Sequence, residues 1–146
     1  MKYTGNGMES LEKKLSEIKK RQIAVGFPKG KCQAYPDGTS VIDVATQHVF
    51  GIGVPERNFM EMAEKGIRKK TKPILRAIYK SDNQTEVGSL QNMAGQVAAD
   101  EIKRAIVELT FPPNSPITIA KKGSDNPLID TTHMLHTVTY VVRKRK

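Results

Sequence analysis

The segment from Val87 to Leu109 constrains the fold of this chain more than any other part of the sequence. Its apolar side chains recur three or four residues apart, which is the spacing of one face of an α-helix. The members of this face are Leu90, Ala94, Val97, Ala98, Ile102, Ala105, Ile106 and Leu109, with Glu101 as the one charged residue among them. A helix of this length must bury such a face against other elements. The sequence therefore predicts one core built around this helix.

Shorter segments have the same helical spacing. Helices are expected around Leu11, Leu15 and Ile18, from Val41 to Phe50, from Phe59 to Tyr79, from Pro116 to Lys121, and for one turn capped by Asp130 or Thr131. Asn58 and Ser115 are suited to cap two of them, because their side chains can accept a hydrogen bond from the first free backbone amides. Pro73 lacks a backbone amide, so the segment from Phe59 to Tyr79 is expected to form two helices or one kinked helix.

Two segments alternate apolar and smaller or polar residues, which is typical of strands. They run from Gln22 to Phe27 and from Val138 to Val142. Paired antiparallel, they form a small sheet between the first and last elements. The fold class is therefore α+β, with a small antiparallel sheet packed against one long helix and several short helices. We expect one domain over residues 1–146, with a flexible tail at 1–7 and a basic tail at 143–146.

The composition narrows the classes of partner. The chain has 24 Lys and Arg against 15 Asp and Glu, a formal net charge of +9, which favours contact with polyanions. Cys32 is the single cysteine, so neither an internal disulfide nor a multi-cysteine zinc site is expected. The N-terminal segment has no apolar stretch of signal-peptide length, and no run is long enough to span a bilayer. We expect no membrane partner.

Residues that could carry catalysis form no convincing set. Asp130, His133 and His136 are the nearest approach to a metal cluster, but a zinc site usually needs a further protein ligand. Cys32 could pair in space with His48, His133 or His136 as a nucleophile and base, although its loop offers nothing to hold the base in place. The sequence therefore predicts a protein that is not an enzyme, with no cofactor, no metal and no small-molecule substrate.

A run of cations stands out within the segment from Phe59 to Tyr79. Its members share one helical face and are Lys65, Arg68, Lys69, Lys72 and Arg76. Such a stripe can neutralise phosphates and bind nucleic acid without sequence preference. The alternative is a solvated helix face that contacts nothing. Only Tyr79 is nearby for base stacking, so a groove for single-stranded nucleic acid is not indicated.

Two segments resemble motifs of a family of tailed-bacteriophage proteins. The first, Val44 to Met60, is similar to Ala-x-x-(His/Asn)-Glu-Phe-Gly followed by Ile-Pro-x-Arg-Pro-Phe-Leu. The second, Ser115 to Gly123 and then Pro127 to Met134, is similar to Ser-x-x-Thr-Ile-x-x-Lys-Gly followed by Pro-Leu-Ile-Asp-Thr-Gly-x-Leu. The resemblance covers about Ile23 to Val142. The chain departs from the family pattern at Val49, Asn58 and Thr132, which stand where the family has Glu, Pro and Gly.

The family comprises virion-morphogenesis, tail-completion (neck) and minor tail proteins. The resemblance implies a structural component of the virion, made in the host bacterial cytoplasm and acting in head–tail joining or in the tail. It also implies contacts with other tail or connector proteins and with copies of the chain itself, arranged as a homo-oligomeric ring. The motif residues that carry these expectations are Gly51, Gly53, Pro55, Arg57, Phe59, Pro127, Asp130 and Thr131.

Physical properties of the motif residues agree with a structural role. Gly51 and Gly53 allow a bend, and Pro55 stiffens its exit. Arg57 can form a two-pronged ion pair with a carboxylate, and Asp130 is the candidate, which would clamp the two motifs together. The other function left open is a phage or prophage accessory protein that binds nucleic acid non-specifically through the basic helix.

Overall fold

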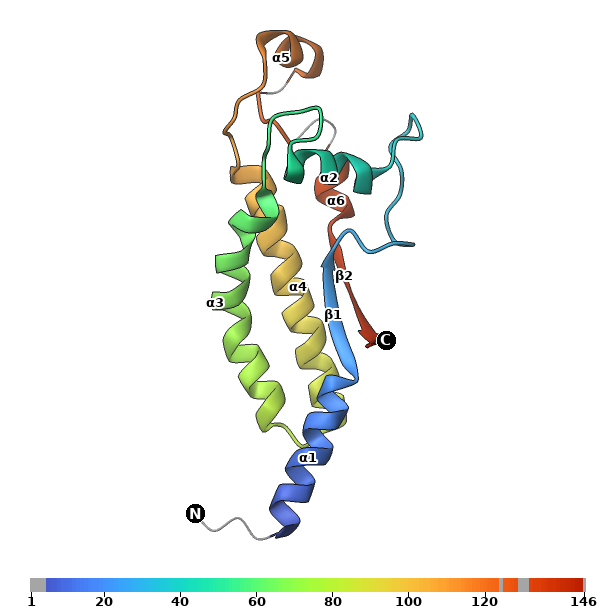
Figure 1. The fold of residues 1–146 in the computed structure, drawn as a ribbon, viewed down its shortest axis with the longest axis vertical. Coiled ribbons are helices and arrows are strands. Elements are labelled where there is room, and N and C mark those ends of the chain that lie inside the picture. The colour runs from blue at the N-terminus through green and yellow to red at the C-terminus, as the bar shows by residue number, and fades with distance from the viewer. Residues whose placement is uncertain (1–4, 124, 129–131, 146) are drawn as a thin grey trace.

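The computed structural model describes residues 5–123, 125–128 and 132–145 of the chain. The elements, in chain order, are α1 (Gly5–Lys19), β1 (Arg21–Gly26), α2 (Val41–Phe50), α3 (Phe59–Lys80), α4 (Gln84–Glu108), α5 (Pro116–Lys122), α6 (His133–Thr137) and β2 (Thr139–Lys144). The molecule is elongated, with α3 and α4 running antiparallel along it and the two strands lying beside α4 (Figure 1). Helices α2, α5 and α6 lie at one end, and α1 extends from the other.

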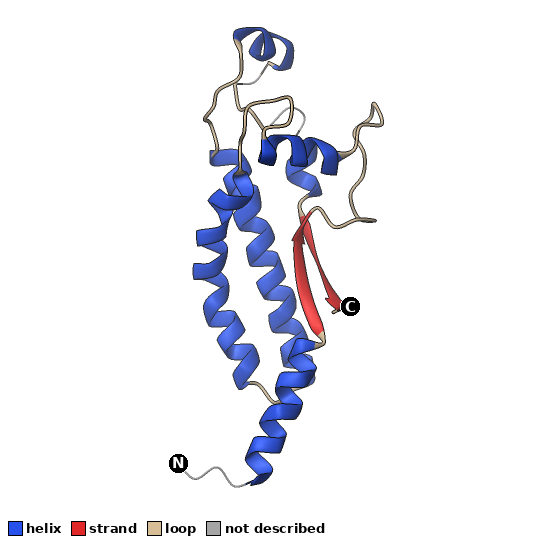
Figure 2. Ribbon diagram, viewed as in Figure 1, coloured by secondary structure: helices blue, strands red, loops and turns tan. Residues whose placement is uncertain are grey.

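The long helix predicted from Val87 to Leu109 is α4, which is slightly longer. It begins after Asn83, whose side-chain oxygen accepts hydrogen bonds from the backbone amides of Thr85 and Glu86 at 2.9 and 3.3 Å. The predicted apolar face supplies much of the buried core, and Ile102, Ala105 and Ile106 are fully buried. The small sheet and the helices around it make this an α+β fold, as the sequence predicted (Figure 2).

Helix α3 decides between the two alternatives that the sequence left open at Pro73. Of two helices or one kinked helix, the structure has one helix, which runs from Phe59 to Lys80 with Pro73 inside it. The fold thus has two long helices and not one. Buried residues on both sides of Pro73, such as Ala63 and Ile78, face the core. Their packing outweighs the loss of one backbone hydrogen bond.

The predicted antiparallel pairing of the first and last strands is confirmed. In the register of β1 and β2, Ile23 lies opposite Val142 and Val25 lies opposite Tyr140. The ring of Tyr140 packs directly on Gly95 of α4, where a β-carbon would overlap it. The absence of a side chain at this position lets the sheet lie close against the helix.

Parts of both predicted tails lie in regular secondary structure. Helix α1 already begins at Gly5, inside the range 1–7 that was assigned to a flexible tail. Arg143 and Lys144, assigned to a basic tail, belong to β2 and pair in register with Gln22 and Arg21. Backbone hydrogen bonding to β1 therefore extends the strand through residues whose side chains are charged and exposed.

Ser115 caps the short helix α5 as predicted. Ser40, for which no cap was predicted, caps α2, and Gly51 ends α2 in the left-handed conformation with φ 66°. The predicted one-turn helix is α6, but its N-cap is Thr132 and not Asp130 or Thr131, which lie outside the described residues. Thr132 has φ 60°, so this threonine adopts the left-handed conformation that the family's glycine would take freely.

Candidate functional site

The two motifs that carry the family resemblance lie at the same end of the molecule. The turn after α2 and the segments on both sides of α5 are at the end of the long axis opposite α1 (Figure 1). Helices α2 and α5 and the segments next to them expose large apolar side chains that are 57 to 79% accessible, namely Phe50, Ile52, Phe111 and Ile117. We call these four residues the apolar pole. Exposed apolar groups gathered at one end are typical of a surface that another protein covers.

Arg57 connects the two sides of this end. Its side chain is 4% exposed. Its Nε donates to the carbonyl oxygen of Pro112 at 2.8 Å, and its Nη2 donates to the carbonyl oxygen of Pro113 at 3.1 Å. The backbone amide of Arg57 also donates to the carbonyl oxygen of His48 at 2.7 Å. One buried cation therefore fixes the turn after α2 against the segment that leaves α4.

These partners are neutral carbonyl groups, which has an electrostatic consequence. Burial lowers the pKa of Arg57, because the charged form loses its hydration. Carbonyl dipoles in part replace the lost water, so a guanidinium with several donors in a fixed plane suits this position better than an ammonium group. Arg57 thus serves to hold the backbone at this end in place.

The contacts of Arg57 continue toward the second motif through two asparagines. Its Nη2 lies 3.4 Å from Oδ1 of Asn114, and Nδ2 of Asn114 donates to the carbonyl oxygen of Asn126 at 3.4 Å. Asn126 also accepts, through Oδ1, from the amide of Leu128 at 3.0 Å. The predicted ion pair of Arg57 with Asp130 involves a residue outside the described ones, and Thr131 lies there too.

The other motif residues take structural positions. Phe59 is fully buried and meets the ring of Phe27 edge-to-face at a centroid distance of 6.2 Å. Pro127 is also fully buried. Gly51 and Gly53 both have positive φ and form the turn between α2 and Pro55. The described motif residues thus either build the core or shape the backbone beneath the apolar pole.

The predicted basic stripe is exposed along α3. All five of its side chains are exposed, and we call them the basic face: Lys65, Arg68, Lys69, Lys72 and Arg76. Arg68 pairs with Glu64 one turn away, at 2.7 Å, which reduces the local charge. Because exposed pairs of this kind contribute little free energy, Arg68 remains available to a stronger anion.

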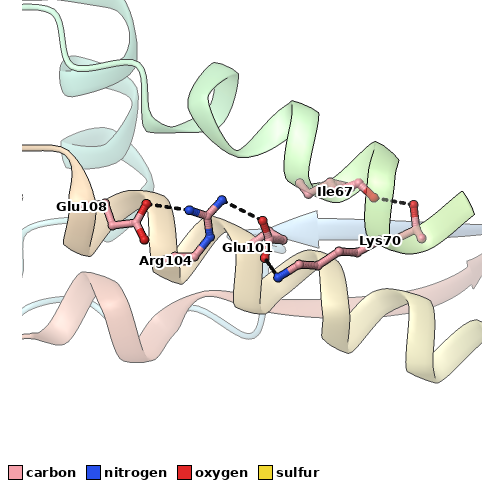
Figure 3. Close-up of polar contacts among 6 residues, drawn as sticks. Ile67, Lys70, Glu101, Arg104 and Glu108 are labelled. Carbon is pink, nitrogen blue, oxygen red and sulfur yellow. Dashed lines mark hydrogen bonds and ion pairs between the residues drawn. The ribbon is translucent and has the colours of Figure 1, made fainter.

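Glu101, the charged residue on the predicted apolar face of α4, is buried in an ion-pair network. Its carboxylate accepts from Nζ of Lys70 on α3 at 2.5 Å and from Nη2 of Arg104 at 2.9 Å (Figure 3). Arg104 in turn contacts Glu108 at 2.5 Å. The hydrogen bonds from Arg104 and Lys70 hold the pKa of Glu101 below its ordinary value. This network joins α3 to α4, and both carboxylate oxygens of Glu101 are used in it.

Cys32 and His133, two of the candidate nucleophile and metal-binding residues, make other contacts. The thiol of Cys32 donates to the carbonyl oxygen of Pro28 at 3.2 Å, and burial raises the pKa of this thiol, which disfavours the reactive thiolate. The ring of His133 lies 4.8 Å from that of Tyr35 and its Nε2 lies 3.1 Å from the carbonyl oxygen of Gln33. Among the described residues, no group of three or more histidines, cysteines and acids is placed to hold a metal ion.

Sequence reasoning missed the side of the fold where α3, α4 and β1 meet. An apolar groove of about 360 Å³ lies there, and it is lined mainly by Ile23, Val25, Ile67, Leu75, Tyr79 and Ala94. The apolar spacing of α3 was the available signal, but the alternatives left open at Pro73 did not establish one continuous helix as a wall of the groove. The amide oxygen of Gln91, at the floor, is buried and has no hydrogen-bond partner among the described residues.

Comparisons with family models, with curated proteins and with solved structures give no significant match to this chain. Within the described part of the chain, no helix is long and apolar enough to cross a membrane.

Proposed function

We propose that this chain is a structural component of a bacteriophage virion, a tail-completion or neck (head–tail joining) protein or a minor tail protein. It acts in particle assembly through contacts with copies of itself and with other tail or connector proteins. In this proposal it performs no catalysis and needs no cofactor. It is assembled in the host cytoplasm and resides in the virion.

One observation carries the proposal. Arg57 of the first motif lies 55 residues before Pro112 in sequence, yet it fixes the first motif against the segment that leads into the second. The backbone held in this way presents the apolar pole to solvent. A buried cation that organises backbone beneath exposed apolar side chains suits a docking surface, because a rigid surface loses little conformational entropy on binding.

The proposal is tested in the phage or prophage that encodes the chain. Phe111→Asp and Ile117→Asp place charge on the apolar pole without disturbing buried groups. We expect both variants to fold and to fail in complementing a deletion of the gene. Negative-stain images should then show tails that are unfinished or not joined to heads. Met93→Asp, on an exposed position of α4, is the matched control and should complement.

Two results would reject this function. One is a deletion that leaves the yield of infectious particles unchanged. The other is normal particle formation by both charged variants of the apolar pole, which would show that no partner covers this surface.

The exposed basic face favours a second candidate function, a phage or prophage accessory protein that binds nucleic acid without sequence preference. All five of its cations are exposed on α3, and one of them, Arg68, is paired with Glu64. Affinity for duplex DNA that falls steeply with salt, in a chain that stays monomeric, would favour this candidate over the assembly role.

A further inference from the structure

Two unpaired apolar surfaces lie toward the end of the molecule opposite the apolar pole. One is the apolar groove, whose α3 wall exposes Leu75 and Tyr79 by 42 and 54%. The other is on α1, where Met8 and Leu11 are 54 and 45% exposed and continue into half-buried Leu15. The C-terminal half of α3 and the whole of α1 lie on the same side of the midpoint of the long axis (Figure 1). We call Met8, Leu11 and Leu15 the α1 stripe.

We propose that the occupant of the apolar groove is the α1 stripe of a second copy of this chain, and that the two copies exchange these helices reciprocally. The inference rests on the proposed assembly role and names the chain itself as one partner. The contact is a two-fold pair of copies, which is distinct from the head-to-tail contacts of the ring that the resemblance implies.

The α1 stripe cannot fold back into the groove of its own chain without losing its anchor. Only Lys20 separates α1 from β1, which is itself a wall of the groove. Nζ of Lys14 pairs with Asp82 at 2.7 Å, beside the turn between α3 and α4. Ile18 already lines the groove from its own chain. These contacts fix the base of α1, and its first two turns therefore point away from the groove, toward solvent and another molecule.

The two surfaces match in length and in character. With a rise of 1.5 Å per residue, the α1 stripe is about 10 Å long and the wall from Ile67 to Tyr79 is about 18 Å long. The stripe therefore fits within the groove. An amphipathic helix in an apolar groove is a common mode of protein recognition, with anchors three and four residues apart as they are at Met8, Leu11 and Leu15.

The charges beside these surfaces are complementary. Glu9 and Glu12 are exposed on the same two turns of α1 as Met8 and Leu11. Lys72 and Arg76 are exposed on α3 on either side of Leu75. Opposite charges around an apolar contact favour the correct partner and orientation over others. Two lysines follow these turns: Lys14 is paired with Asp82, and Lys13 is exposed.

A reciprocal contact also supplies the area that a stable dimer needs. One short helix in one groove covers little surface, whereas stable interfaces bury at least roughly 1,200 Å² in total. A two-fold axis repeats the same contact, since each copy both gives its α1 and receives the other. The closed arrangement hides both apolar surfaces of both chains.

Analytical ultracentrifugation of the purified full chain tests the self-association. We expect a concentration-dependent dimer at moderate salt. Leu11→Asp on α1 and Leu75→Asp on α3 should each weaken the dimer by roughly tenfold or more, because each places a charge at the apolar contact. Ser16→Asp adds the same charge to α1 off the stripe and should leave the dimer unchanged. A wild-type chain that remains monomeric over the whole concentration range would overturn the inference.

Disulfide trapping tests which surfaces meet. In chains that also carry Cys32→Ser, Leu11→Cys and Leu75→Cys are made singly and then mixed under mild oxidation. We expect covalent heterodimers linked between the two positions, and a doubly linked dimer from a chain with both cysteines. A disulfide within one chain, or no link between the two single-cysteine chains, would contradict the exchange. These assays contain no phage particle, so their failure would leave the proposed virion role standing.

Discussion

Gly66 of α3 lies so close to Glu101 of α4 that a β-carbon at position 66 would overlap Oε2 of that carboxylate. The same β-carbon would lie 3.2 Å from Nη2 of Arg104. The missing side chain at Gly66 therefore leaves room for the buried acid and its partner cation. The close packing of the two long helices and the ion-pair network depend on each other at this point.

Gly66→Ala should destabilise the protein by about 1–3 kcal/mol, because the added methyl group displaces a buried carboxylate from its cations. Urea unfolding measured by circular dichroism checks this change. Gly88→Ala is the matched control, since it adds the same methyl group to α4 where no atom lies within 4 Å. The control should raise stability by up to about 1 kcal/mol through helix propensity. Equal effects of the two substitutions would contradict the packing described.

Glu101→Gln should lower the free energy of unfolding at pH 7 by about 2 kcal/mol, because the neutral amide loses two charge-assisted hydrogen bonds. The pKa of Glu101 is held below its ordinary value, so the ionised form stabilises the fold above a pH of roughly 4.3. That contribution is lost as the pH falls through the pKa of the folded state. The difference between wild type and variant should thus shrink below pH 4.

Stability curves from pH 7 to pH 3 measure this convergence. Glu108→Gln is the control on the same helix, because Glu108 also contacts Arg104 but is exposed. It should change stability by no more than about 0.5 kcal/mol at any pH. Parallel curves for wild type and Glu101→Gln would show that the buried carboxylate does not stabilise the fold through its charge.

Thr132→Gly should stabilise the protein by about 1 kcal/mol. Thr132 has φ 60°, and a left-handed conformation costs a residue with a β-carbon roughly 1–2 kcal/mol. Glycine avoids that cost but loses more backbone entropy on folding, which leaves a smaller net gain. Thr132→Val keeps the branched side chain and should show no gain. Thermal melts decide between them, and a less stable Thr132→Gly would mean that the threonine side chain contributes more than its backbone strain costs.

Removing the charge of Lys65, Lys69, Lys72 and Arg76 together, by substitution with Gln, should weaken binding to duplex DNA if the basic face contacts phosphates. The plot of log affinity against log salt should then lose about 3–4 units of slope, since each phosphate contact contributes about 0.9. Fluorescence anisotropy with a labelled duplex gives both quantities. The control removes four other exposed cations, Lys13, Lys19, Lys29 and Lys31. An equal loss in the control would show that net charge alone is responsible.

The elements with regular apolar spacing were predictable from sequence. Features that depend on contacts between distant segments were not. The face of α4 and the alternation in β1 and β2 are local patterns, so their predictions are confirmed. The sequence could not decide between two helices and one kinked helix at Pro73, because the outcome depends on packing on both sides of the proline, and packing is not a local property. The left-handed threonine at 132 was signalled only by a glycine in the resembling family.

In the candidate functional site, too, some features were predictable from sequence and others were not. Exposure of the basic face follows from helical periodicity and was predicted. The partners of Arg57 were not predictable, because the carbonyl oxygens of Pro112 and Pro113 belong to the backbone and carry no side-chain signal. Lys70 lies 31 residues from Glu101, so their ion pair required the antiparallel arrangement of α3 and α4. The type of side chain indicated which groups need a hydrogen-bond or ion-pair partner. The arrangement of the helices and strands determined which residues became those partners.

The pairing of β1 with β2 determines when this chain finishes folding as it is made. The strand that completes the sheet is synthesised roughly 120 residues after its partner, a delay on the order of ten seconds at ordinary rates of translation. During that interval α3 and α4 can form their hairpin, while Ile23 and Val25 have no strand hydrogen-bonded beside them. A ribosome that stalls before Thr139 therefore leaves a nascent chain with an open strand edge, which other chains can capture.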